Sequence, residues 1–178
     1  MKWGIRMKRI TKVNNKGYSL IEIIIVVAIV AIVSSAGTAS LNLIHNSKVS
    51  TAARTVNSYC KSVRLNNMTK KELKYIHVFK KNNSNYVYVD SNKSANLTKT
   101  EKEIGNTNLA IYYGSTSGSK SAITNDNVIT ITFDRSGQCQ ILNKSGSIIS
   151  TVDLLSFTNG KRSSDIIISK LTGKVTME

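Results

Sequence analysis

A single carboxylate stands at the start of a long apolar run near the N-terminus. Lys16-Gly17 is followed by Tyr18-Ser19-Leu20-Ile21-Glu22, and every residue from Ile23 to Val33 is apolar. A charge placed in hydrocarbon costs about 2.5–3.5 kcal/mol on insertion scales, so it needs a compensating partner. Because Glu22 lies close to one end of the run, the amino terminus of a second chain could reach it. We therefore expect Glu22 to have a role in assembly.

This pattern resembles the N-terminal signal of type IV prepilins and type II secretion pseudopilins. The resemblance implies that a membrane-embedded aspartyl prepilin peptidase cuts between Gly17 and Tyr18 and methylates the new amine of Tyr18. Glu22 would then be the fifth residue and would direct assembly. Family members usually have Phe at the first position, and Tyr18 keeps a large aromatic side chain there.

The resemblance also implies partners and a location. The partners are the peptidase, other pilins or pseudopilins in a filament, the inner-membrane assembly platform and the membrane. The chain would first be a single-pass protein of the cytoplasmic (inner) membrane with its C-terminal domain outside, and later part of an extracellular or periplasmic filament. No cofactor is implied.

The basic residues of the leader agree with this orientation. The formal charge is +15, and six positive residues precede the predicted cut, which leaves 15 − 6 = +9 for the mature chain. Positive charge favours retention of the leader in the cytoplasm. The six are Lys2, Arg6, Lys8, Arg9, Lys12 and Lys16. Met7 is a second candidate start, and the sequence does not choose between it and Met1.

Two other interpretations of the N-terminus stay open. A basic segment before an apolar stretch also begins a secretory signal peptide, and Ala36-Gly37-Thr38-Ala39 could serve as its cleavage site. A plain transmembrane anchor has the same apolar length, but it gives no reason to keep Glu22.

Helical periodicity continues beyond the apolar run. We predict a helix from Tyr18 to about Glu72, because no proline interrupts it and apolar residues recur at three- and four-residue spacing. Residues 18–39 would cross a membrane or enter a filament core, and residues 40–73 would continue as an amphipathic helix. The expected apolar stripe consists of Leu41, Ile44, Ala52, Val56, Cys60, Val63 and Met68.

Residues 74–178 change to a strand-like pattern. A hairpin is predicted from Tyr75–Phe79 and Tyr86–Val89 around a polar turn. Further strands are expected at Leu109–Tyr113, Val128–Phe133, Gln140–Leu142, Ile148–Leu155, Ile166–Ser169 and Lys174–Met177, separated by short turns. The predicted fold class is α+β: a long N-terminal helix, membrane-spanning in its first half, packed on a mainly antiparallel β domain, as in pilins.

Two C-terminal segments extend the resemblance. Ile131-Thr132-Phe133-Asp134-Arg135-Ser136-Gly137 is similar to a segment of H-type pseudopilins and FimT-like minor pilins, and Ile166 to Val175 is similar to their closing hairpin, with Lys174 where Arg is common. This implies a minor subunit that is assembled into, or primes, a type IV pilus-like filament or type II secretion pseudopilus. A major pilin is the alternative, and residues 66–127 match nothing in this group.

An enzyme is not expected. The two histidines, His45 and His77, have no acid or cysteine spaced as a co-ligand, so no metal site is predicted. Two Ser-x-x-Lys matches, at Ser58 and Ser117, lack the motifs that accompany them in β-lactamases.

The two cysteines leave two interpretations open. Cys60 lies on the predicted helix stripe and Cys139 in a strand. In an exporting environment they could form a disulfide, or both could be small buried hydrophobes.

A second functional hypothesis is DNA binding by a minor pilin of a transformation (DNA-uptake) pilus. The mature charge of +9 and the basic residues Lys161, Arg162, Lys170 and Lys174 could neutralise phosphates. The alternative is that these residues simply form a solvated surface.

Overall fold

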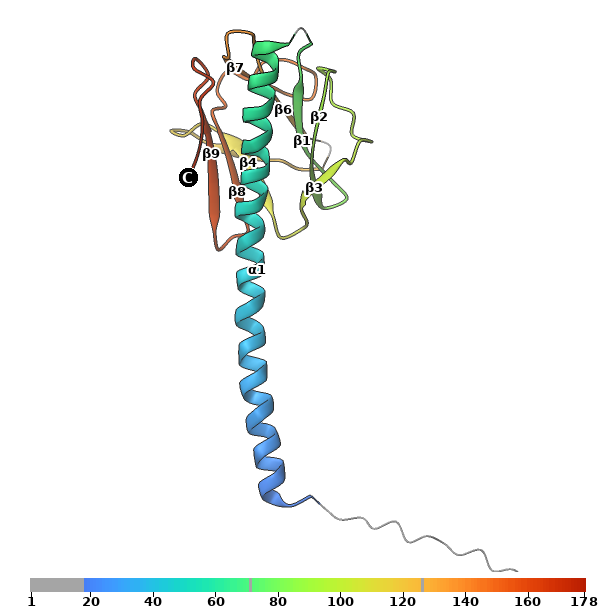
Figure 1. The fold of residues 1–178 in the computed structure, drawn as a ribbon, viewed down its shortest axis with the longest axis vertical. Coiled ribbons are helices and arrows are strands. Elements are labelled where there is room, and N and C mark those ends of the chain that lie inside the picture. The colour runs from blue at the N-terminus through green and yellow to red at the C-terminus, as the bar shows by residue number, and fades with distance from the viewer. Residues whose placement is uncertain (1–17, 71, 126) are drawn as a thin grey trace, which may run out of the picture. The chain divides into compact units, whose positions relative to one another are not determined.

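The structure is a computed structural model that describes residues 18–70, 72–125 and 127–178, with side chains for all of these except residues 35–46 (Figure 1). The chain divides into two compact units, Met1–Ser40 and Leu41–Glu178. Helix α1 (Leu20–Thr69) contributes to both, and its bounds confirm the predicted helix to within three residues. The predicted leader, residues 1–17, lies outside the described residues.

In the second unit the described residues form two five-stranded sheets. The first has the order β3 (Lys102–Gly105), β2 (Ser84–Asp90), β1 (Tyr75–Lys81), β6 (Val128–Phe133) and β7 (Cys139–Leu142). The second has the order β10 (Val175–Met177), β9 (Ser163–Ile168), β8 (Leu154–Thr158), β4 (Ala110–Gly114) and β5 (Lys120–Ala122). All strand pairs in these sheets are antiparallel, so the α+β prediction is confirmed.

The buried face of α1 joins both sheets in one core (Figure 1). Val49, Ala52, Ala53, Val56, Cys60 and Val63 are buried on this face. They pack in one cluster with residues of both sheets, such as Ile131 of the first and Phe157 of the second. The predicted stripe is wrong at Met68, which is 46% exposed, because the helix extends past the edge of the core there. Leu41 and Ile44 lie outside the described side chains.

The first hairpin follows the sequence pattern closely. Strands β1 and β2 pair from Tyr75↔Asp90 to Lys81↔Ser84, which leaves Asn82 and Asn83 as the turn. Both turn residues have positive φ, 49° and 63°. Two left-handed residues give a turn whose twist matches that of the strands, and asparagine tolerates this conformation better than most side chains.

Other strands depart from the predictions. The strand expected at Ile148–Leu155 begins at Leu154 instead, and Ile148 is 61% exposed and forms an isolated bridge with Leu142. Strands β3 and β5 were not predicted, because Lys-Glu-Ile-Gly and Lys-Ser-Ala carry no apolar alternation. Both are edge strands, so backbone pairing with one neighbour forms them without a strong side-chain pattern.

A second, smaller apolar cluster covers the other face of the first sheet. Phe79, Tyr88 and Val128 are buried there beneath Ala95 and Leu97 of the segment between β2 and β3. Polar contacts hold this segment: the hydroxyl of Tyr88 accepts a hydrogen bond from the backbone N–H of Asn96, and Lys81 Nζ donates to the carbonyl of Leu97 over 3.1 Å.

His77 is fully buried beside this cluster. Its Nε2 lies 3.0 Å from the carbonyl oxygen of Asn92 and 3.3 Å from Asp90 Oδ1, and its Nδ1 lies 2.8 Å from Thr130 Oγ1. Two acceptors at Nε2 require a proton there, so the neutral ring donates through Nε2 and accepts from Thr130 at Nδ1. Burial lowers the pKa of His77, and the Asp90 carboxylate offsets part of this effect. The fold therefore favours the neutral imidazole.

We expect the second unit to lose stability as the pH falls below 6.5. The unfolded chain then binds a proton at His77 that the folded chain resists, which costs up to about 1.4 kcal/mol per pH unit. Urea unfolding of a fragment of residues 47–178, which excludes His45, would measure this between pH 7 and 5. His77→Gln should lower stability at pH 7 and flatten the pH dependence; an equally steep dependence in that variant would contradict the assignment.

Asn67 ties the end of α1 to the first sheet. This residue is fully buried, and its Nδ2 donates to the carbonyl oxygens of Phe133 and Lys74 over 2.8 and 3.0 Å. Its Oδ1 accepts from the backbone N–H of Lys74 over 2.8 Å. One side chain thus satisfies backbone groups at the end of β6 and just before β1.

Replacing Asn67 with Ala should lower the free energy of unfolding by about 2–4 kcal/mol, because the buried carbonyl of Phe133 and the partly buried backbone groups of Lys74 lose their hydrogen bonds to Asn67. Asn66→Ala is the matched control, since Asn66 is the adjacent helical residue and its Oδ1 has no hydrogen-bond partner. The control should change stability by less than about 1 kcal/mol. Equal losses for the two variants in urea unfolding would show that the contacts of Asn67 contribute little.

Candidate processing and assembly site

The N-terminus of α1 is capped by Ser19. Its Oγ accepts a hydrogen bond from the backbone N–H of Glu22 over 3.2 Å, and its carbonyl accepts from the N–H groups of Glu22 and Ile23 over 3.0 and 3.3 Å. Ser-x-x-Glu is the pattern of a capping box, in which serine is the N-cap and the glutamate lies three residues later. The pattern Ser19-Leu20-Ile21-Glu22 is visible in the sequence and is the signal by which this cap could have been predicted.

Glu22 lies in the first turn of α1 and is exposed. Its carboxylate is favourably placed there, because the partial positive charge at the N-terminus of a helix stabilises an anion. None of the four ion pairs found between described residues includes Glu22. Glu22 is therefore placed to stabilise the start of the helix, and its role in assembly stays a prediction.

Tyr18, the residue after the predicted cut, precedes the helix and is 78% exposed. Gly17 lies outside the described residues, so the structure describes only Tyr18 of the two residues that flank the predicted cut. Cleavage at this bond and methylation of Tyr18 stay predictions.

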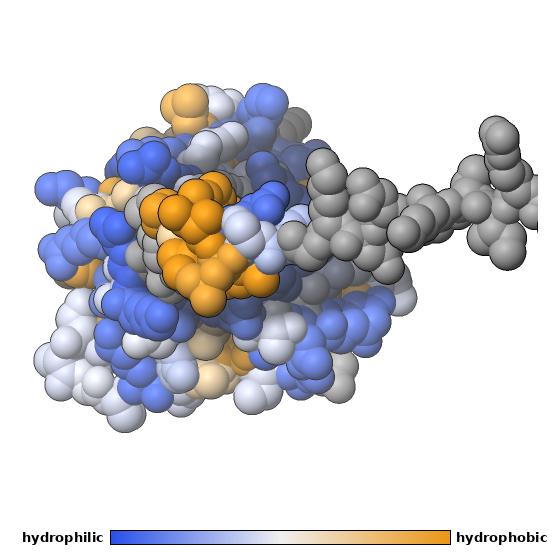
Figure 2. Space-filling model, turned by 90° about the horizontal axis from the view of Figure 1, so that it is seen from below, coloured by the Kyte–Doolittle hydropathy of each residue, from blue (hydrophilic) through white to orange (hydrophobic). Residues whose placement is uncertain are grey.

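The helix surface that follows Glu22 is apolar and uncovered within the first unit. Among the described residues from Leu20 to Val33, eleven aliphatic side chains are between 53% and 77% exposed. Apolar side chains form an orange surface in the view from below (Figure 2). The eleven exposed aliphatic side chains are Leu20, Ile21, Ile23, Ile24, Ile25, Val26, Val27, Ile29, Val30, Ile32 and Val33. An apolar surface of this extent needs cover from another apolar phase or another molecule.

In the part of the chain that the structure describes, no helix is both long and apolar enough to cross a membrane. The span predicted over residues 18–39 includes 35–39, whose side chains lie outside that part.

Comparison with known proteins identifies the N-terminal pattern. Residues 12–38 match the family described as the prokaryotic N-terminal methylation motif. This match covers the predicted cleavage site, Tyr18 and Glu22, and it supports a type IV prepilin-like N-terminus. No curated protein and no solved structure matches the chain.

The two C-terminal segments that carried the H-type resemblance meet in space. The turn after β6 and the turn between β9 and β10 touch: a Cβ added at Gly173 would lie 1.8 Å from the carbonyl oxygen of Gly137. The backbone N–H of Cys139 donates to the carbonyl of Lys170 over 2.9 Å. Arg64 of α1 donates to the carbonyls of Gly137 and Thr172 over 3.4 and 2.8 Å and so links both turns to the helix.

The two cysteines are thiols buried in the shared core. Burial raises the pKa of Cys60 far above its usual range, and the nearby Cys139 raises it further. Burial likewise raises the pKa of Cys139 to about 12, against the opposing effect of Lys170. Both groups are therefore neutral and poorly nucleophilic at physiological pH. Their burial agrees with the interpretation as small buried hydrophobes, and the alternative interpretation as a disulfide stays a prediction.

The four basic residues proposed for nucleic-acid contact do not form one patch. Lys161 and Arg162 lie in the turn before β9, whereas Lys170 and Lys174 lie in the turn after it. The six residues of β9 separate the two pairs by about 20 Å. Lys170 Nζ donates to the carbonyl of Ser150, and Lys174 lines a groove beside α1.

Within residues 18–70, 72–125 and 127–178, no group of three or more His, Cys, Asp or Glu side chains could hold a metal ion. His77 is fully engaged in the network described above. His45 lies outside the described side chains.

Proposed function

We propose that this chain is a minor pilin or pseudopilin of the H-type group, which a prepilin peptidase cuts after Gly17 and methylates at Tyr18. The match of residues 12–38 to the N-terminal methylation motif carries this proposal. The order of parts along the chain adds support, because a long N-terminal helix precedes a two-sheet antiparallel β unit. The turns that resemble H-type pseudopilins favour the minor role.

The exposed apolar helix explains why such a subunit assembles. Compared with a helix left exposed to water outside the bilayer, burying the eleven aliphatic side chains against neighbouring helices would contribute about 10 kcal/mol, at roughly 1 kcal/mol each. Desolvating Glu22 and a positively charged amine costs several kcal/mol per ion, and pairing the two offsets part of that. Apolar burial therefore outweighs the cost of the buried charges. The ion pair selects the axial offset between subunits.

Removal of the leader is required because its charges would also be buried in the filament. The leader carries six positive charges before the predicted cut, and they would have to enter the apolar core with the helix. The cost of six unpaired cations exceeds what the aliphatic side chains contribute. In the membrane, the uncut chain would be held with its leader in the cytoplasm.

The first test is the mature N-terminus. We expect co-expression with a prepilin peptidase to yield a chain that begins with methylated Tyr18, and mass spectrometry of the intact protein would measure this. Gly17→Val is the control, since a side chain at that position should block the cut and leave the full length. An uncut wild-type chain, or a cut within residues 36–39, would contradict the proposal and favour an anchored or secreted domain.

The second test distinguishes the effect of the Glu22 charge on filament incorporation from the effect of the helix cap at Ser19. Glu22→Gln keeps the length and hydrogen-bonding capacity of the side chain but removes its charge. We expect Glu22→Gln and Glu22→Ala to be cleaved normally and to enter filaments at least about tenfold less than wild type, as judged by immunoblot of sheared filaments.

Ser19→Ala is the complementary control for this test. It removes the Oγ cap, worth about 1 kcal/mol, and leaves the carboxylate in place. We expect this variant to be incorporated. Normal incorporation of Glu22→Gln would instead show that Glu22 acts through the cap and not through its charge.

A further inference from the structure

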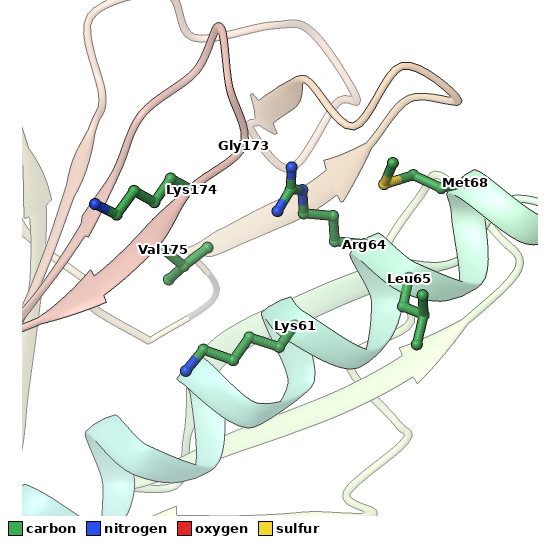
Figure 3. A pocket seen from close by; sticks show the side chains of 7 residues that line it. All are labelled: Lys61, Arg64, Leu65, Met68, Gly173, Lys174 and Val175. Atoms are coloured by element: carbon green, nitrogen blue, oxygen red, sulfur yellow. The ribbon is translucent and has the colours of Figure 1, made fainter.

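A groove lies between the C-terminal end of α1 and strand β10 (Figure 3). Helix α1 supplies Lys61, Arg64, Leu65 and Met68, and the other wall is formed by residues 173–175. We call it the α1–β10 groove. Its volume is about 230 Å³, below the 300–1,000 Å³ of typical small-molecule sites. It has room for one or two side chains of a binding partner.

The α1 side of the groove carries exposed apolar side chains at the edge of the core of the second unit. Leu65 is 66% exposed and Met68 is 46% exposed, although both belong to the helix whose opposite side is buried in the core. Leu171, in the adjoining turn, is 81% exposed. Leu65 and Met68 lie three residues apart, so they are neighbours on the helix surface and form an exposed apolar pair, and methionine adapts its shape to different partners.

The groove is also positively charged without local compensation. Lys61 and Lys174 are exposed, and Figure 3 shows Arg64 between them and Met68. The four ion pairs found between described residues involve none of these three cations. The hydrogen bonds of Arg64 go to neutral backbone carbonyls, so its position is fixed but its charge is not neutralised.

Close backbone contacts hold the wall of the groove formed by residues 173–175 against the turn after β6. Gly173 has φ +60° and touches the backbone of Gly137, which has φ +83°. A side chain at Gly137 would contact Met68 Sδ at 3.1 Å and Arg64 at 3.3 Å, so both glycines allow the two turns to approach the helix. Because these contacts and the hydrogen bonds of Arg64 already fix the backbone of the wall, little backbone ordering is needed on binding.

We propose that the α1–β10 groove is a docking site for an acidic segment of a partner protein, with an aliphatic side chain between carboxylates. The carboxylates would face Lys61, Arg64 and Lys174, and the aliphatic side chain would pack on Leu65 and Met68. Nucleic acid fits less well, because phosphates gain nothing from an aliphatic floor and no aromatic side chain lines the groove for base stacking. The inference does not rest on processing or filament assembly.

Fluorescence anisotropy of a labelled peptide tests this on the full chain in non-ionic detergent. The probe is Glu-Glu-Leu-Glu-Glu, compared with Glu-Glu-Ser-Glu-Glu. We expect the leucine peptide to bind more tightly. Lys61→Glu combined with Lys174→Glu should weaken its binding at least about tenfold, and Leu65→Ser about threefold or more.

Matched control variants test whether the same changes elsewhere on the surface also weaken peptide binding. Lys93→Glu combined with Lys144→Glu makes the same charge change on exposed lysines elsewhere, and Ile148→Ser removes an aliphatic side chain that is 61% exposed. Both should leave peptide affinity within about twofold of wild type.

Four outcomes would overturn the proposal. The first is an equal loss in the control variants, and the second is equal binding of the two peptides. The third is tighter, Lys61-dependent binding of a DNA duplex, which would assign the groove to nucleic acid. The fourth is self-association of the chain that Leu65→Ser abolishes, with no peptide binding, which would assign the groove to a second copy.

Discussion

The packing of one face of α1 against both sheets is the constraint on which the second unit depends. The two sheets share no hydrogen-bonded strand pair, so side-chain packing supplies most of the contact between them, and the bond from the N–H of Cys139 to the carbonyl of Lys170 adds a backbone link. The helix face between Val49 and Val63 supplies the common surface, and it includes two small, fully buried residues, Ala52 and Ala53. Without that face, the inner side of each sheet would be exposed to water, and the edges at β3 and β10 would have no helix beside them.

Apolar packing by itself would let the helix slide or rotate, and directional contacts near its C-terminal end prevent this. Asn67 bonds to backbone groups near β1 and β6, and Arg64 bonds to the turns that contain Gly137 and Gly173. A hydrogen bond weakens steeply when its angle changes, so these two side chains fix the register of α1 against both sheets. The same contacts shape the α1–β10 groove, which therefore belongs to the frame of the fold and not to a mobile loop.

The two units use one helix for opposite purposes. Between Val49 and Val63 its apolar side chains are buried within the chain, whereas between Leu20 and Val33 they are exposed. The first arrangement stabilises a monomeric unit. The second is unfavourable in water and is relieved by lipid or by the helices of other subunits, in agreement with the methylation motif that begins just before it. Glu22 adds a charge at the start of the exposed part, where the helix N-terminus stabilises it locally.

The sequence by itself determined the parts of this protein that depend on local pattern. The motif around Gly17 and Glu22, the helix up to Thr69 and the Asn82-Asn83 hairpin follow from residue order, because neighbouring residues create their own periodicity, caps and turns. The tertiary structure decided what depends on residues far apart. It formed β3 and β5 from weak edge sequences, moved Met68 out of the core, and separated Lys161 from Lys174 by the length of β9. It also brought Arg64 to Thr172, 108 residues away, because sheet pairing and core packing choose such neighbours and no local pattern encodes them.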